Sequence, residues 1–269
     1  MSPQSILRRV RVGAAMLMLL AVGSPCGVWA EEASQPNDVP SLLKDLGSSD
    51  SSIASQAAKR LSLKGTDSKH VISALAEAIK HPNELVRLTV IEALSELGPD
   101  AGPAVPALSD ALQDKDPMIR EAAALALFST GAQARKAVPA LIGRLDDPSK
   151  RVRDGVVLVL ANLGKDAVGG LIKALDSSDV LVRATAAQAL GRMGAVAVPD
   201  LITVLKRAEP GSSEAASIAL IYVGPPAVPP LIDLVTAGNA KAAKLAGDTL
   251  EGIGAAAVPG LVRELKKRR

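Results

Sequence analysis

Apolar and polar positions alternate in blocks that recur every 30 to 34 residues between positions 38 and 269. Within one block, the stretch DVLVRATAAQALGRMG (179–194) places small apolar residues such as Ala186 and Ala187 on one side of a helix. The next stretch, AVPDLITVLKR (197–207), repeats leucine and isoleucine at the same period. Its proline falls in the first turn, where a missing N–H costs little. The pattern therefore predicts pairs of amphipathic helices repeated along the chain.

Short local signals mark where these helices begin and end. The first helix of each unit starts at the phrase Ala-Val-Pro or a weaker copy of it, which gives seven full units and a final half unit. The second helices are expected to follow the capping positions Asp50, Asn83, Asp116, Ser149, Asp179, Glu209 and Asn239. They are expected to end before glycines in a left-handed conformation, at Gly65, Gly98, Gly131, Gly164, Gly194, Gly224 and Gly254.

The second-helix motif, Asp179, Val182-Arg183, Ala186-Ala187, Ala189-Leu190 and Met193-Gly194, resembles the short HEAT-like repeat of the phycobilisome-lyase type. The resemblance covers residues 38–269 and is strongest in repeats two to five. It implies an all-α fold, a right-handed α-solenoid of about seven and a half two-helix HEAT-like repeats. A solenoid of this kind offers an extended surface to partners.

One arginine recurs four residues after the capping position, at Arg87, Arg120, Arg153 and Arg183. An arginine near a helix N-terminus opposes the helix dipole, so it needs local acceptors. The resemblance implies an Asp–Arg ladder between neighbouring repeats, for which Asp116 and Asp179 are the candidate acids. The turn at Asp146-Asp147 is also within reach. Binding of an anion or of an acidic partner by these arginines is the alternative.

The first thirty residues have the pattern of a secretory signal peptide. Three arginines, at positions 8, 9 and 11, precede an apolar run from Val12 to Val22, which is too short to span a bilayer. Cleavage is predicted between Ala30 and Glu31. The expected organisation is a signal peptide (1–30), a short acidic linker (31–38) and the solenoid (39–269). The protein is then exported, periplasmic or secreted, without a membrane span; an uncleaved anchor, or a lipoprotein through Cys26, is the alternative.

Removing the signal peptide changes what composition implies. The whole chain has 31 basic and 28 acidic residues, and the signal carries three arginines and no acid, which leaves 28 of each. Net charge therefore gives no reason to expect a nucleic-acid partner. The only cysteine and tryptophan, Cys26 and Trp29, leave with it, so the mature chain can form no disulfide. With only 1% aromatic residues, the core must pack closely through Ala, Leu, Val and Ile.

Residues that could carry chemistry are few. His70 and His81 are the only histidines, and without cysteine they make no recognisable metal site. His81 is expected to be a solvated turn residue. No nucleophile elbow or phosphate-binding glycine loop occurs. No catalytic residue, cofactor or metal is therefore expected.

The candidate binding residues lie on the outer side of the second helices. Positions five and nine after the arginine share that side, and in repeats three, four and six the first of these is apolar. Together with the mature aromatics, the candidates are Leu125, Phe128, Leu158, Gln188, Arg192, Ile218 and Tyr222. The alternative is that these side chains fill gaps between helices.

These features favour an exported, non-enzymatic scaffold or adaptor that binds a protein or peptide on the concave face of the solenoid. Two other functions stay open. One is an enzyme, or an enzyme subunit, of bilin-lyase or protein-modification type. The other is an envelope assembly factor that associates through the basic tail RELKKRR (263–269). The oligomeric state and the partner's identity cannot be read from the sequence.

Overall fold

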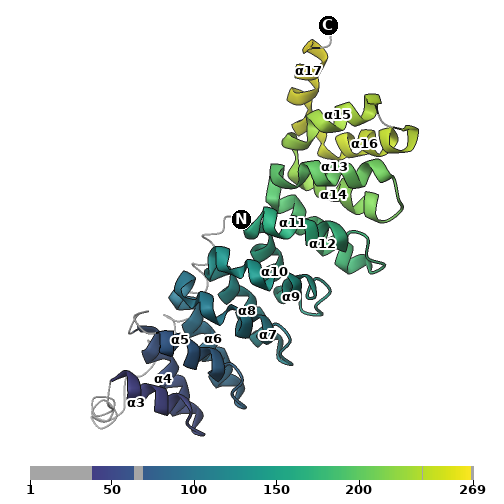
Figure 1. The fold of residues 1–269 in the computed structure, drawn as a ribbon. Coiled ribbons are helices and arrows are strands. Elements are labelled where there is room, and N and C mark those ends of the chain that lie inside the picture. The colour runs from purple at the N-terminus through teal and green to yellow at the C-terminus, as the bar shows by residue number, and fades with distance from the viewer. Residues whose placement is uncertain (1–37, 64–68, 238, 268–269) are drawn as a thin grey trace, which may run out of the picture. The chain divides into compact units, whose positions relative to one another are not determined.

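The computed structural model describes residues 38–63, 69–237 and 239–267. Residues 39–269 form one compact unit. This unit is an α-solenoid: pairs of antiparallel helices follow one another from α3 to α17 (Figure 1). The predicted signal peptide, its cleavage point at Ala30 and Glu31, and nearly all of the 31–38 linker lie outside the described residues.

Each repeat contributes a first and a second helix, and several first helices are preceded by a 3-10 turn. The first helices are α3 (Val39–Leu46), α5 (Lys69–Ala78), α7 (Val105–Ala111), α9 (Val138–Ile142), α11 (Lys165–Ala174), α13 (Val198–Arg207), α15 (Val228–Ala237) and α17 (Val258–Lys267). The second helices are α4 (Ser51–Leu63), α6 (Glu84–Leu97), α8 (Pro117–Ser129), α10 (Lys150–Leu163), α12 (Val180–Met193), α14 (Ser212–Val223) and α16 (Ala240–Ile253). The 3-10 segments are η1 (Gly98–Ala104), η2 (Gly131–Ala137), η3 (Gly194–Ala197), η4 (Pro225–Ala227) and η5 (Gly254–Ala257).

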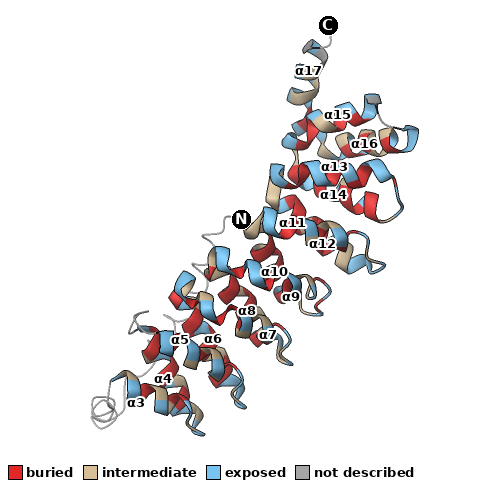
Figure 2. Ribbon diagram, viewed as in Figure 1, coloured by how far each residue is buried: buried red, intermediate tan, exposed pale blue. Residues whose placement is uncertain are grey.

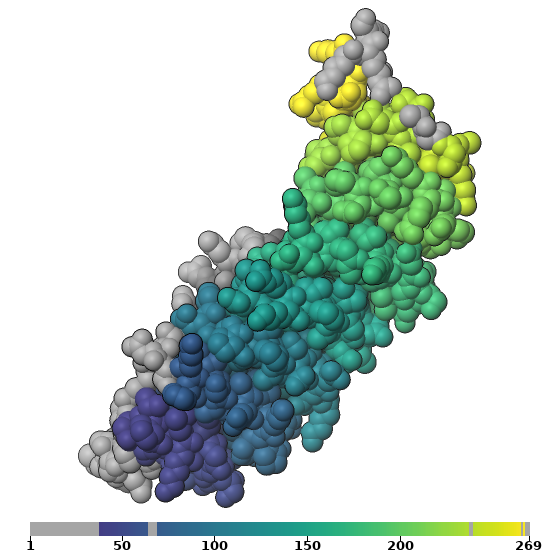
Figure 3. All heavy atoms as spheres, viewed as in Figure 1, coloured from purple at the N-terminus to yellow at the C-terminus, as the bar shows by residue number. Residues whose placement is uncertain are grey.

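The core is one continuous cluster of buried side chains that runs along the array from Leu42 to Ala246. Buried residues line the sides where helices meet, and exposed ones face outward (Figure 2). Successive second helices pack directly side by side, and successive repeats appear as successive bands of colour (Figure 3). Alanines of the second helices, for example Ala186 and Ala187 of α12, are fully buried. Small side chains thus give the close packing that a core almost without aromatic residues requires.

The capping residues behave as predicted in most repeats. The side chains of Asp50, Asn83, Asp116, Asp179 and Asn239 accept hydrogen bonds from backbone N–H groups in the first turn of the next helix. Two repeats differ. Ser149 is the N-cap of α10, but its side chain makes no capping hydrogen bond. In repeat six the N-cap of α14 is Gly211, with φ 83°, and not the predicted Glu209. The preceding Ala208 takes a left-handed conformation, so this turn is longer than the sequence alignment implies.

Of the glycines predicted to end the second helices, Gly65 lies outside the described residues. The other six have positive φ, as predicted. All but Gly131 have ψ between −122° and −140°, which is not the left-handed helical conformation. At Gly194, for example, φ is 66° and ψ is −138°, a region that side chains with a Cβ avoid more strongly. The longer linkers after Gly98 and Gly131 form the 3-10 segments η1 and η2. The first helix of repeat four, α9, is much shorter than its counterparts.

Substitution of two glycines tests whether glycine is required at the helix ends by its backbone conformation or by a lack of space for a side chain. A Cβ at either Gly194 or Gly169 would meet no atom within 4 Å, but only Gly194 has a positive φ. We expect Gly194→Ala to cost about 2 kcal/mol of unfolding free energy. Gly169→Ala, inside α11, should instead stabilise by about 0.5–1 kcal/mol. Urea unfolding followed by circular dichroism measures both; equal effects of the same sign would contradict the conformational argument.

Candidate binding surface and inter-repeat ladder

A ladder of arginines joins the turns of neighbouring repeats. The Nη1 of Arg87 donates to the carbonyls of His81 and Pro82 in its own turn, both at 3.1 Å. Its Nε and Nη2 donate to both carboxylate oxygens of Asp114 in the next repeat, at 2.8 and 3.2 Å. One guanidinium therefore ties its own turn to the turn that follows.

Arg120 repeats this arrangement one unit further along. Its Nη1 donates to the carbonyl of Asp114 at 2.9 Å, and its Nε and Nη2 both lie 2.8 Å from the carboxylate of Asp147. Asp147 is only 2% exposed. Burial acts to raise the pKa of Asp147, but hydrogen bonds from Arg120 and from the Ser149 N–H outweigh it, so the pKa is lowered. The same hydrogen bond raises the pKa of Arg120.

The ladder loses its carboxylates after repeat four. The Nη1 of Arg153 donates to the carbonyl oxygens of Asp147 and Pro148, and that of Arg183 to Ser177 and Ser178. Within the described part of the chain, neither guanidinium has a carboxylate partner. Of the four predicted arginines, two therefore form the full bridge and two form only the half within their own turn.

The predicted acids of the ladder require a correction. Asp116 and Asp179 cap α8 and α12 and are not the ladder acceptors. The acceptors are Asp114, which was not predicted, and Asp147, from the turn that was expected to be within reach; each stands two residues before a capping position. At that position the Oδ1 of each also accepts the N–H of the capping residue, which fixes the carboxylate for the arginine.

His81 occupies the corresponding position in repeat two and was expected to be a solvated turn residue. Repeat one has Ala54 in place of the arginine. The Nδ1 of His81 accepts the N–H of Asn83, so the ring carries its proton on Nε2, which donates to the carbonyl of Ser48 at 3.3 Å. The imidazole thus takes over the link that an arginine makes in later repeats.

A second set of contacts joins the C-terminal ends of the second helices. In each pair, the residue eight positions after the arginine site of one repeat contacts the residue nine positions after the arginine site of the next repeat. Ser62 donates to Glu96 at 2.7 Å, and the hydroxyls of Ser95 and Ser129 lie 3.0 Å apart. Between α12 and α14 the contact at these positions is steric and not polar. A Cβ at Gly191 would lie 2.4 Å from the Cβ of Tyr222, so only glycine leaves room for the tyrosine. The base of Tyr222 therefore rests on a glycine notch in α12.

The structure separates the predicted binding residues into two groups. Leu125, Leu158 and Gln188 are half-buried, whereas Arg192, Ile218 and Tyr222 are exposed; Ile218 is 47% and Tyr222 65% exposed. The prediction for Phe128 is corrected. Its side chain is only partly exposed and packs against the core, because it lies where two helices meet and not on the open face. The exposed part of the predicted face therefore lies on α12 and α14.

Acidic groups occupy the same face on α6 and α8. Desolvation raises the pKa of Glu92; repulsion from Glu96 adds to this, and Lys59 opposes it. Desolvation also raises the pKa of Glu121, where Arg151, at 4.0 Å, opposes it and Asp154 adds to it. An acid recurs on α14, where Glu214 stands at the position of Glu121 and is exposed, but the exposed apolar side chains Ile218 and Tyr222 occur there as well.

The prediction missed a row of exposed apolar residues in the first turns of the second helices. Leu85, Met118, Val180 and Leu181 are all exposed. Apolar residues directly after a capping position were the available signal, but helical periodicity alone assigns such residues to the core.

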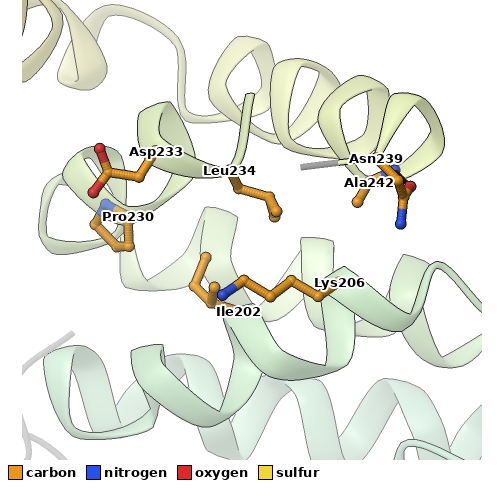
Figure 4. A pocket seen from close by; sticks show the side chains of 7 residues that line it. All are labelled: Ile202, Lys206, Pro230, Asp233, Leu234, Asn239 and Ala242. Carbon is orange, nitrogen blue, oxygen red and sulfur yellow. Dashed lines mark hydrogen bonds between the residues drawn. The ribbon is translucent and has the colours of Figure 1, made fainter. Parts of the chain in front are cut away.

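A hollow of about 540 Å³ lies between α13 and α15. Figure 4 shows the Lys206 side chain running beside Ile202, with Leu234 and Asp233 on the opposing helix. The comparable groove between α5 and α7 is lined by Arg87. Repeat six has Ser213 at that position, so no arginine enters the hollow there.

Two further properties concern the described residues. No group of three or more His, Cys, Asp or Glu side chains among them is placed to hold a metal ion. None of the helices within these ranges combines the length and the apolar character needed to cross a membrane.

The fold and its ladder define the class of helical-repeat solenoids. Family comparison finds the model for HEAT repeats at residues 39–127, 100–161, 138–220 and 168–251. The chain belongs to the HEAT repeat family. Comparison with curated proteins finds no match.

Comparison with solved structures finds similar chains at low identity. An engineered protein is 23% identical, with TM-score 0.46, over 82% of this chain and 98% of its own. A HEAT-like repeat protein from the archaeon Thermococcus onnurineus NA1 is 16% identical, with TM-score 0.46, over 82% and 99%. The complex of CpcE and CpcF of phycocyanin lyase from Nostoc sp. PCC7120 is 21% identical, with TM-score 0.44, over 90% and 95%.

The two kinds of arginine should differ in what they contribute to stability. Arg120→Ala leaves the buried Asp147 carboxylate unpaired, so we expect a loss of about 3 kcal/mol. Arg153→Ala removes hydrogen bonds to two carbonyls only and should cost about 1 kcal/mol. Denaturant midpoints of both variants check the order. A loss at Arg153 as large as at Arg120 would show that the carboxylate bridge is not the stronger joint.

The lowered pKa of Asp147 predicts a defined pH dependence. A folded pKa below the unfolded value of about 3.9 means that the carboxylate stabilises the fold above that pH and loses this contribution as the pH falls through the folded pKa. The stability difference between the wild type and Asp147→Asn should therefore be constant near neutral pH and shrink below about pH 4. Urea midpoints over a pH series test this, with Asp146→Asn, one residue earlier and exposed, as the matched control.

Proposed function

We propose that this chain is an exported, non-enzymatic scaffold that binds a protein or peptide on the concave face formed by its second helices. The contact is centred on α12 and α14. Membership of the HEAT repeat family supports a binding role, because such arrays present extended surfaces assembled from successive repeats. Export is inferred from residues 1–30, whose charged start, apolar run and small-residue end are typical of a signal peptide.

The exposure of Tyr222 carries the choice of surface. Tyr222 is 65% exposed, while its Cβ packs closely against Gly191 of α12, so the side chain is presented to solvent from a packed base. Ile218 lies one turn earlier on the same face of α14, and Arg192 is exposed on α12. Tyrosine and arginine are the residue types that most often dominate binding energy at protein interfaces.

Paired substitutions on two faces test the surface. We expect Ile218→Asp and Tyr222→Ala to reduce capture of the partner about tenfold or more, without loss of helix content, because both side chains point to solvent. Val235→Asp on the first helix α15 is the matched control, since Val235 is also an exposed apolar residue. Quantitative mass spectrometry of proteins that co-purify with the tagged mature chain measures the effect.

The same experiment defines how far the contact extends. Leu125→Asp combined with Leu158→Asp places charges on the half-buried part of the face. A folded double variant with undiminished capture would restrict the contact to α12 and α14. If Val235→Asp abolished capture and Tyr222→Ala did not, the partner would dock on the first helices and the proposal would be wrong.

A further inference from the structure

Arg87 and Arg120 each bind two turns, whereas Arg153 and Arg183 bind only the carbonyls of their own turn, so their Nε and Nη2 donors have no carboxylate partner among the described residues. In the complete bridges, Nε and Nη2 form a two-pronged contact with an aspartate of the next repeat. At the acceptor position that follows Arg153 stands Ser177. In the longer turn that follows Arg183, Glu209 stands two residues before the cap Gly211; it is exposed and, among the described residues, makes no ion pair with Arg183. In residues 38–63, 69–237 and 239–267, no carboxylate contacts the Nε or Nη2 of these two arginines.

These two guanidinium groups are nevertheless held in place. Nη1 of Arg183 donates to the carbonyls of Ser177 and Ser178 at 2.7 and 3.0 Å, and Arg153 makes the equivalent pair of bonds. Both side chains are only half-buried, so the remaining edge is accessible. A donor edge that is fixed before binding loses little conformational entropy when an acceptor arrives.

The Nε–Nη2 edge of Arg183 faces the turn at Gly211, where the absence of a side chain leaves space beside the guanidinium. A Cβ at Gly211 would lie 3.5 Å from Nε of Arg183, so glycine keeps a side chain from covering the guanidinium. The guanidinium of Arg207 pairs with the carboxylate of Asp176, at 3.3 Å. Val180 and Leu181, 68% and 38% exposed, add apolar surface in the same helical turn region as Arg183.

We propose that Arg153 and Arg183 form a binding site for two carboxylates of an acidic peptide segment, which complete the interrupted ladder from outside. A carboxylate fits because the same guanidinium edge takes an aspartate in the same geometry at Arg87 and Arg120. The two arginines belong to adjacent second helices, whose axes lie roughly 8–10 Å apart. That separation corresponds to about three residues of extended chain, which selects acidic residues spaced i and i+3.

This site does not use the residues of the second-helix face and is independent of the proposed function. The probe is a fluorescein-labelled Gly/Ser peptide carrying two glutamates about three residues apart, and the control peptide carries glutamines. Fluorescence anisotropy at low ionic strength should show that the full mature chain binds the glutamate peptide about tenfold more tightly or better. Equal binding of the two peptides would overturn the proposal.

Ser177→Asp is the decisive variant, because it supplies the missing carboxylate from within the protein. It should raise the melting midpoint, as a third complete bridge forms, and weaken binding of the glutamate peptide about tenfold. Ser177→Asn, which has the same shape without the charge, should leave binding unchanged. Arg183→Gln should weaken binding to a similar degree as Ser177→Asp.

Each contrary result has a defined meaning. Undiminished binding by Ser177→Asp, with or without a change in melting midpoint, would exclude the free edge of Arg153 as part of the site. Inorganic phosphate that competes as strongly as the glutamate peptide would show a general anion site and overturn the choice of a carboxylate segment.

Discussion

The guanidinium group that spans two turns is the interaction on which this array depends. A solenoid has no contacts between distant repeats, so its geometry is set at each joint between neighbours. Helix packing alone leaves freedom to slide and rotate within ridges and grooves. The bridge from Arg120 to the carbonyl of Asp114 and to the carboxylate of Asp147 fixes two turns with directional hydrogen bonds. It thereby restricts how one repeat can be placed on the next.

Burial makes this joint strong but dependent on its partner. The Asp147 carboxylate is removed from water and is held by Arg120 and by the Ser149 N–H together. A desolvated charge of this kind is tolerated only while its hydrogen bonds are complete. Where the acid is absent, at Arg153 and Arg183, the arginine keeps its own turn ordered but does not join it to the next. Local order and coupling between repeats are thus separate properties of the same side chain.

Periodicity in the sequence was enough to predict the helices, most caps and the positive φ of the terminal glycines. Those features depend on residues within one turn of each other. Of the ladder acids, the turn that contains Asp147 was anticipated, but Asp114 was missed, because it lies 27 residues from Arg87 and the alignment of two turns across a joint depends on packing. Asp116, which is also near Arg120, was the plausible choice from spacing alone. The role of His81 and the helix start at Gly211 were missed because each departs from the repeat. His81 stands where later repeats have the ladder aspartate, and Gly211 caps α14 where other second helices are capped by a polar residue.

The predicted binding face was only partly correct for a reason of geometry. Helical spacing places Phe128 close to the exposed side, but the neighbouring helix covers that position, so Phe128 packs against the core. Tyr222, one position further along in its own repeat, stays open because Gly191 gives it room. The distance between adjacent helices determines which of the two aromatic side chains is covered, and this distance cannot be read from a single sequence.

The uneven distribution of the complete bridges also gives the array a mechanical polarity. Two consecutive joints, between repeats two and three and between three and four, are cross-linked by arginine and aspartate. The joint between repeats six and seven has Ser213 in place of an arginine and encloses the hollow beside Lys206. When such an array is pulled at its two ends, each joint bears the same force, so the weakest joint yields first. The joint between repeats six and seven is held by helix packing and by the contact between the Ser217 and Thr249 hydroxyls, so it is expected to separate before the two joints that Arg87 and Arg120 cross-link.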